Sequence, residues 1–155
     1  MPNDIIAQLK NSQSRLSACL IPVADDQDWR PRPGAWSFRE IAAHLATAES
    51  ECLQPRLKRI ASGEHPHFEL YLNTDRDFSG FDLRAALRDW ANTRQAIFDF
   101  VRGLTVEQLT LTATHAFYGT LTVPGYLQAW LAHDQEHLDE LERLLIQHAA
   151  EKAHT

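Results

Sequence analysis

The sequence predicts an all-α protein, a four-helix bundle with long connections, and three observations support this prediction. Four segments repeat apolar side chains every three or four residues, the spacing of a helix with one buried face. No segment sustains the alternation of a β-strand, and only HAFYGTLTV (115–123) has β character, limited by Gly119 to a hairpin or extended connection. A chain of 155 residues fits one domain, so four amphipathic helices must pack on one another.

The boundaries of the first two helices follow from caps and prolines. The first helix covers residues 5–20, and Pro22 ends it. The second begins at Ser37, which forms an S-x-x-E capping box with Glu40. Pro55 should kink or end this helix at the preceding residue, although a helical composition resumes beyond it.

The last two helices have equally clear signals. The third has the cleanest heptad, over residues 83–101, and Gly103 closes it. LTVEQL (104–109) is a short capped turn, and the fourth helix starts near Thr122, with a frayed tail expected over 148–155. Connections of roughly 15 to 20 residues leave room for a crossover between parallel neighbours, but their lengths do not say which connection crosses.

Composition restricts the classes of partner. A net charge of −6 without a basic run argues against nucleic acid or an anionic membrane surface, which need basic patches. Cys19 and Cys52 lack CxxC spacing and are read as two reduced, buried thiols. The N-terminus does not have the layout of a signal peptide, and no apolar run reaches membrane-spanning length. A cytoplasmic location is the default expectation.

Two histidines in the last helix suggest a metal site. His133 and His137 are four residues apart, so both rings point the same way and can reach one point in space. By itself an HxxxH pair is weak evidence, because such pairs arise often by chance. Here the pair shares its face with Trp130, Leu141 and Leu144. Imidazoles that face inward need partners, so a third ligand is expected from a facing helix.

His44 is the natural third ligand. It lies in the second helix between Ile41 and Ala48, on the side expected to be buried. A lone histidine there would more often be a core residue bonded to a carbonyl. Its coincidence with an inward HxxxH instead favours a three-histidine site for a divalent metal.

The other polar candidates are weaker. The loop EHPHF carries two histidines at 65–67 that are expected to face solvent. For His115, which precedes an aromatic turn, a structural role is at least as well supported. The capping box already explains Glu40, although an orienting role beside His44 stays open. Asp134 and Glu136 are expected to face water or a neighbouring helix.

Two stretches carry a resemblance to a known family. RPRPGAWSFREIAAHLATAE (30–49) is similar to the opening signature of the DinB-like (YfiT-like) metalloenzyme family, with Trp-Ser, an acidic residue, His-Leu and a terminal Ala-Glu. THAFYGTLTVPGYLQAWLAHDQEHLDEL (114–141) resembles its second signature, with a histidine before an aromatic-Gly turn and HxxxH on the last helix. The resemblance covers the whole chain in order, and its specificity lies in this combination.

The resemblance implies an up-down-down-up bundle, a homodimer, and a divalent metal held by three histidines. These histidines map onto His44, His133 and His137. The chain departs from the family in three places: Pro55 interrupts a commonly continuous helix, Asp139-Glu140 replaces a usual glutamine, and the loop 68–82 has no recognised substrate signature. The substrate therefore stays open.

The expected chemistry follows from the ligand set. Three neutral imidazoles leave a metal its full charge and an open position, as in catalytic sites. The resemblance implies hydrolases, and transferases that use thiols such as bacillithiol or mycothiol. We therefore expect a metal that presents a thiolate or hydroxide to a small electrophilic molecule. Weak candidates for handling protons or orienting groups are Glu40, His115 and Tyr118.

The cofactor and partner expectations are equally specific. Zn²⁺ or Ni²⁺ is the first expectation for the metal, with Fe and Mn as alternatives, and a low-molecular-weight thiol is the expected cosubstrate. The expected partners are a small-molecule substrate and a second copy of the chain, with no nucleic acid and no membrane. The competing interpretation is a non-catalytic, stress-linked bundle in which the metal is structural.

Overall fold

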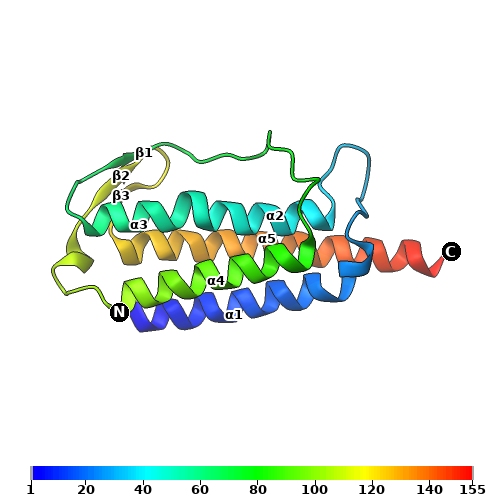
Figure 1. Ribbon diagram of the computed structural model, residues 1–155, viewed down its shortest axis with the longest axis horizontal. Coiled ribbons are helices and arrows are strands. Elements are labelled where there is room, and N and C mark those ends of the chain that lie inside the picture. The colour runs from blue at the N-terminus through cyan, green and yellow to red at the C-terminus, as the bar shows by residue number, and fades with distance from the viewer. Residues whose placement is uncertain (1, 155) are drawn as a thin grey trace.

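Helices dominate the computed structural model, which describes residues 2–154 (Figure 1). The helices are α1 (Pro2–Leu20), α2 (Phe38–Ala48), α3 (Gln54–Ala61), α4 (Leu83–Arg102) and α5 (Val123–Ala153). Short 3-10 turns cover Ile21–Asp26 and Gln108–Thr110. A π-helical turn, Glu49–Leu53, joins α2 to α3, so that the two form one continuous rod. The predicted four-helix bundle is confirmed.

The helices run up-down-down-up, as the resemblance implied. In Figure 1, α1 and α5 run in one direction, and the α2–α3 rod and α4 run in the other. The crossover that sequence length could not identify is the connection 62–82, which returns along the whole bundle between α3 and α4 (Figure 1). We call residues 69–77 of this connection the strap.

A small sheet closes one end of the bundle. β2 (Ala113–His115) and β3 (Gly119–Leu121) form an antiparallel hairpin, and β1 (His67–Phe68) pairs with β2 in parallel. Of the two predicted alternatives, a hairpin or an extended connection, the structure has the hairpin, and Gly119 has the positive φ of +77° that its turn requires. β1 was not predicted, because two residues can be recognised as a strand only through a partner far away in the sequence.

The predicted caps are present. The hydroxyl of Ser37 accepts from the backbone N–H of Glu40 at 3.2 Å, and the Glu40 carboxylate accepts from the N–H of Ser37 at 3.0 Å. Thr105 and Gln108 form the second predicted box at 104–109. Thr122 caps α5 by accepting from the N–H of Gly125 at 3.1 Å.

Pro55 does not end the second helix. Proline removes one helical N–H and its ring crowds the carbonyl four residues earlier. The turn Glu49–Leu53 immediately before it is π-helical, a wider turn that accommodates this loss and lets the helix continue to Ala61. The predicted kink is therefore a π-bulge within a continuous rod.

The expected frayed tail over 148–155 is wrong for the residues that the structure describes. Helix α5 continues to Ala153. The Nε2 atom of His148 lies 2.7 Å from a carboxylate oxygen of Asp26, and its ring contacts the rings of Trp29 and Phe38. These contacts with the first connection hold the end of the helix; Thr155 lies outside the described residues.

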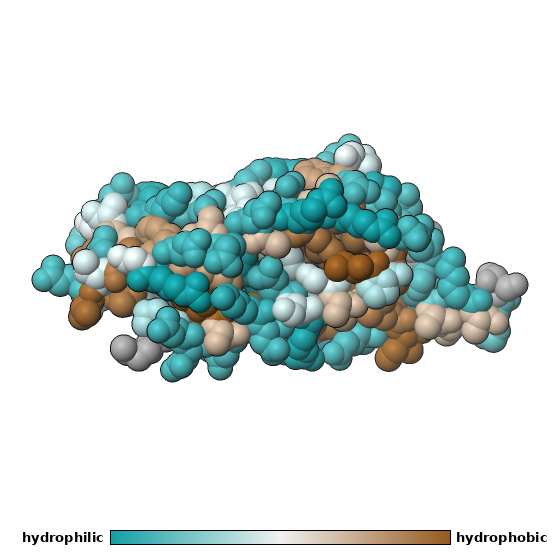
Figure 2. All heavy atoms as spheres, turned by 60° about the horizontal axis from the view of Figure 1, so that its bottom comes forward, coloured by the Kyte–Doolittle hydropathy of each residue, from teal (hydrophilic) through white to brown (hydrophobic). Residues whose placement is uncertain are grey.

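The apolar interior forms two clusters along the bundle. One includes Leu9, Leu57 and Phe98, and the other includes Leu16 and Trp90. Hydrophilic side chains cover most of the face shown in Figure 2. Both cysteines are free thiols, and within residues 2–154 no helix combines the length and hydropathy needed to cross a membrane.

Candidate functional site

A cavity of about 210 Å³ lies between the α2–α3 rod, α5, the strap and the hairpin. Its wall contains all three predicted ligands, His44, His133 and His137. The π-turn of the rod adds Glu49 and Cys52 to the same wall. The widened turn before Pro55 therefore lies beside the cavity. In proteins generally, π-bulges are frequently found at functional sites.

The rings of His44 and His137 are in contact, with centroids 5.1 Å apart. Nδ1 of His44 lies 2.6 Å from the amide oxygen of Asn73, on the strap. An amide oxygen can only accept, so Nδ1 carries the proton and Nε2 keeps its lone pair. Nε2 of His133 lies 2.6 Å from the hydroxyl of Tyr118.

Burial favours the neutral form of two of these imidazoles, His44 and His137. Burial, together with the neighbouring rings of His44 and His133, lowers the pKa of His137 to about 4. Burial also lowers the pKa of His44, against the opposing effect of its bond to Asn73. At neutral pH both rings are therefore in the form that binds metals.

The low pKa of His137 predicts how the stability of the metal-free protein depends on pH. In the unfolded chain this histidine has its ordinary pKa of 6.5, whereas in the folded chain its pKa is about 4. The free energy of unfolding should therefore fall as pH decreases from 6.5 to 4, by at most about 3 kcal/mol. Urea unfolding at several pH values in this range measures the free energy of unfolding. This free energy should depend less steeply on pH in His137→Gln than in wild type, and an equal dependence in both proteins would contradict the assignment.

The three histidines share one wall but do not converge on one point. Within residues 2–154, no three His, Cys, Asp or Glu side chains are placed so that they could hold one metal ion as they stand. His133 is engaged by Tyr118, so binding with the other two histidines would require it to exchange that hydrogen bond for the ion. The type of donor nonetheless fits a divalent metal, because all three are imidazoles and two have pKa values lowered by burial.

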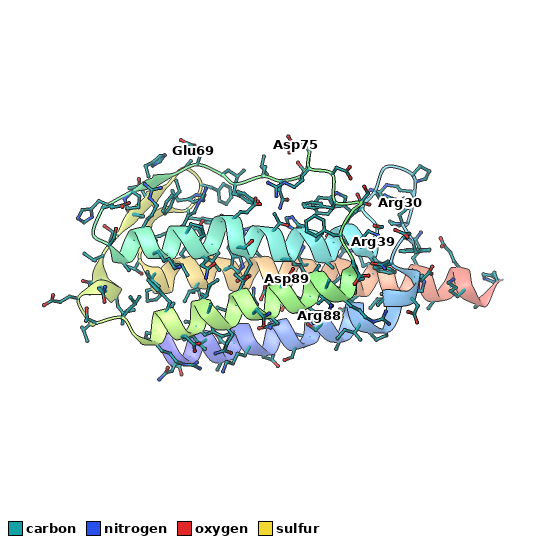
Figure 3. All side chains as sticks on the ribbon, viewed as in Figure 1. Arg30, Arg39, Glu69, Asp75, Arg88 and Asp89 are labelled. Carbon is teal, nitrogen blue, oxygen red and sulfur yellow. The ribbon has the colours of Figure 1, made fainter. Side chains whose placement is uncertain are left out.

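The structure separates the three weak catalytic candidates. His115 and Tyr118 line the cavity. Nδ1 of His115 accepts the backbone N–H groups of Phe117 and Tyr118 at 3.0 and 3.2 Å, so it also shapes the hairpin turn. Glu40 does not line the cavity. It pairs with Arg30 at 2.8 Å at the start of α2. Figure 3 shows Arg30 far along the bundle from Glu69 on the strap.

Sequence reasoning missed a buried ionic network that includes two residues of the cavity wall, Glu49 and Asp134. Arg94 of α4 donates to the carboxylates of Glu49 and Asp134, at 2.7 Å each. The indole N–H groups of Trp90 and Trp130 also donate to Glu49, and Trp130 lines the cavity. Asp134 was expected to face water or a neighbouring helix; it faces the neighbouring helix α4 through Arg94 and is only 2% exposed. The sequence feature that could have indicated this network is Arg94, a charged residue on the otherwise apolar stripe of residues 83–101.

Comparison with known proteins defines the family and the fold of the chain. The DinB superfamily model matches residues 8–141, and the chain is a member of that superfamily. In fold it is similar to YfiT from Bacillus subtilis, described as a probable metal-dependent hydrolase with an unusual four-helix bundle topology. The two are 22% identical, with a TM-score of 0.74 over 93% of this chain and 87% of YfiT. No curated protein matches the chain.

Proposed function

We propose that the chain is a metal-dependent enzyme that acts on a small electrophilic molecule, as a hydrolase or as a transferase using a low-molecular-weight thiol. In this proposal His44, His133 and His137 hold a divalent metal, with Zn²⁺ or Ni²⁺ the first choices. The observation that carries the proposal is that three imidazoles, from α2 and α5, line the same cavity. The description of YfiT as a probable metal-dependent hydrolase supports it.

The residues around His44 suit this role. Asn73 accepts the proton of Nδ1, which fixes the tautomer and leaves Nε2 as the nitrogen that would bind the metal. A divalent cation bound by imidazoles supplies Lewis acidity, which lowers the pKa of water or of a thiol and polarises a substrate. Leu70 and Leu72 of the strap and Trp130 add apolar surface to the cavity wall.

Two polar groups of the chain could act on a bound substrate. Because Nδ1 of His115 accepts two backbone N–H groups, the proton of the neutral ring lies on Nε2, from which it can be donated. The hydroxyl of Tyr118 lies beside His133 and can hold a proton at the metal end of the cavity. Burial raises the pKa of Tyr118, so the phenol stays protonated at neutral pH.

A purely structural metal is less well supported. Across residues 2–154, every fully buried side-chain nitrogen or oxygen has a hydrogen-bond partner. The bundle interior is therefore satisfied by protein groups, and folding has no buried donor or acceptor that requires a metal. A structural metal would make removal by chelation strongly destabilising, whereas the enzyme hypothesis expects loss of turnover with little loss of folding.

The decisive assay is a panel of small electrophiles, incubated with zinc-loaded or nickel-loaded protein and with several cellular thiols or water alone. We expect turnover by wild type and a loss of at least about 100-fold in His44→Ala. His154→Ala, an exposed histidine beyond α5, is the matched control and should keep full activity. Wild-type rates no higher than those of metal-free protein across the panel would contradict the enzyme hypothesis.

The hydrogen bond from His44 to Asn73 yields a separate prediction. Asn73→Ala should lower zinc affinity by about 10- to 100-fold, because the ring loses the acceptor that fixes its orientation and tautomer. Competition with a chromophoric chelator measures this affinity. Asn92→Ala, an exposed site on α4, should leave it unchanged. Equal affinities of wild type and Asn73→Ala would show that Asn73 does not orient a ligand.

A further inference from the structure

A cationic side chain lines the cavity on the α3 segment of the rod. Arg56 donates from Nη1 to the hydroxyl of Tyr126 at 2.9 Å, and from Nη2 to the backbone carbonyl of Glu69 at 2.9 Å. The guanidinium lies over the ring of Phe68, 4.7 Å from its centroid, which holds it in place. A guanidinium has five N–H groups, so three of them remain for a ligand.

The charge of Arg56 is not balanced by a carboxylate. Within residues 2–154 it forms no ion pair, and the other arginines without one, Arg32, Arg88 and Arg143, are exposed at the surface. The carboxylate of Glu69 lies beside His67, and its side chain is 78% exposed, on the outer side of the strap (Figure 3). Three carboxylates also line the cavity: Glu49 and Asp134 pair with Arg94, and Glu136 is exposed at the surface. Among the described lining residues, Arg56 is therefore a positive charge without an ion-pair partner.

The remaining surface of the cavity is mostly apolar and aromatic. Trp130, Tyr126, Leu70 and Ala48 are part of it. Arg56 acts on this space electrostatically: burial lowers the pKa of His115, and the positive charge of Arg56 lowers it further. A partly buried cation in an apolar cavity favours an anion, because a charge-assisted hydrogen bond is strong where water is largely excluded.

We infer that the cavity binds a small carboxylate, with its carboxylate group on Arg56 and an apolar or aromatic body against Trp130 and Tyr126. If the proposed function holds, this is the substrate class, and the carboxylate anchors the molecule while its other end lies toward the histidines. Only the claim that the bound molecule reacts rests on the proposed function. Binding itself depends on Arg56 and the cavity.

Phenylacetate and phenylacetamide are matched probes, because they have the same shape and differ in charge. Titration calorimetry on full-length, metal-free protein should show that phenylacetate binds at least about tenfold more tightly than phenylacetamide. This ratio is what a charge-assisted hydrogen bond contributes. Arg56→Gln should remove this preference. Arg59→Gln should keep it, because Arg59 lies over the same Phe68 ring but pairs with Glu64 and does not line the cavity.

Metal-free protein keeps this test separate from the proposed function, since a carboxylate cannot then be held by a metal. Loss of zinc binding with a retained phenylacetate preference would overturn the metal proposal alone. If Arg56→Gln does not fold, wild type supplies the readout: the Nε–H resonance of Arg56 should shift with phenylacetate and not with phenylacetamide. Equal affinities for the two probes, or a preference that survives in Arg56→Gln, would overturn the inference.

Discussion

Replacing His133 with alanine is expected to abolish stoichiometric zinc binding while the melting temperature of the metal-free protein changes by only a few degrees. His133 and His137 are four residues apart on α5, so both rings can bind the same zinc ion from one face of the helix. Removal of either leaves two donors on different helices. We expect the affinity to fall by at least about 100-fold. Titration calorimetry, together with metal analysis after dialysis, measures this change.

His44→Ala and His137→Ala should behave in the same way, because each removes one of three ligands. His154→Ala again serves as the control for loss of an exposed histidine. A His133→Ala protein that keeps one equivalent of zinc at wild-type affinity would exclude this residue from the site. An equal loss in His154→Ala would show that the binding is adventitious.

Replacing Arg94 with alanine should lower the free energy of unfolding by roughly 3–5 kcal/mol. The change leaves the carboxylates of Glu49 and Asp134, 1% and 2% exposed, without their common cation. A buried charge that loses its partner keeps its full desolvation cost. Denaturant unfolding followed by circular dichroism measures the difference.

Arg84→Ala provides the matched surface control. Its ion pair with Asp25 joins side chains that are 50% and 94% exposed, so its loss should change stability by less than about 1 kcal/mol. If Arg94→Ala were no more destabilising than Arg84→Ala, the buried network would not support the bundle. Because Trp130 donates to Glu49, Arg94→Ala should also alter the emission of Trp130 in the cavity wall.

The fold could be predicted from the sequence because its signals are local. Ser37 with Glu40, Thr105 with Gln108, and Thr122 are caps that depend on neighbours a few residues away. The helical faces also identified the three helical histidines, His44, His133 and His137, among the residues that line the cavity. The exact form of the helix at Pro55 was not predictable, because a kink and a π-turn both relieve the same lost hydrogen bond.

The missed parts of the site depend on contacts between distant segments. Asn73 meets His44 only because the strap crosses the bundle, and no pattern in the loop 68–82 indicates this. Glu49 and Asp134 are on different helices and become an ionic network only when Arg94 of α4 lies between them. Arg56 is a candidate anion-binding residue because it has no carboxylate partner within the described residues. The sequence does not indicate this, because the partners of Arg56 are set by the folded chain.

A crystal structure of the zinc-loaded protein, with anomalous data collected at the zinc edge, tests the central claim most directly. The proposal predicts one strong anomalous peak in the cavity, bonded to nitrogens of His44, His133 and His137 at about 2.0–2.1 Å, with at least one further position open to solvent or ligand. A peak bonded to other residues, or a fully loaded crystal in which His133 still bonds Tyr118 and no peak lies among the three rings, would contradict it.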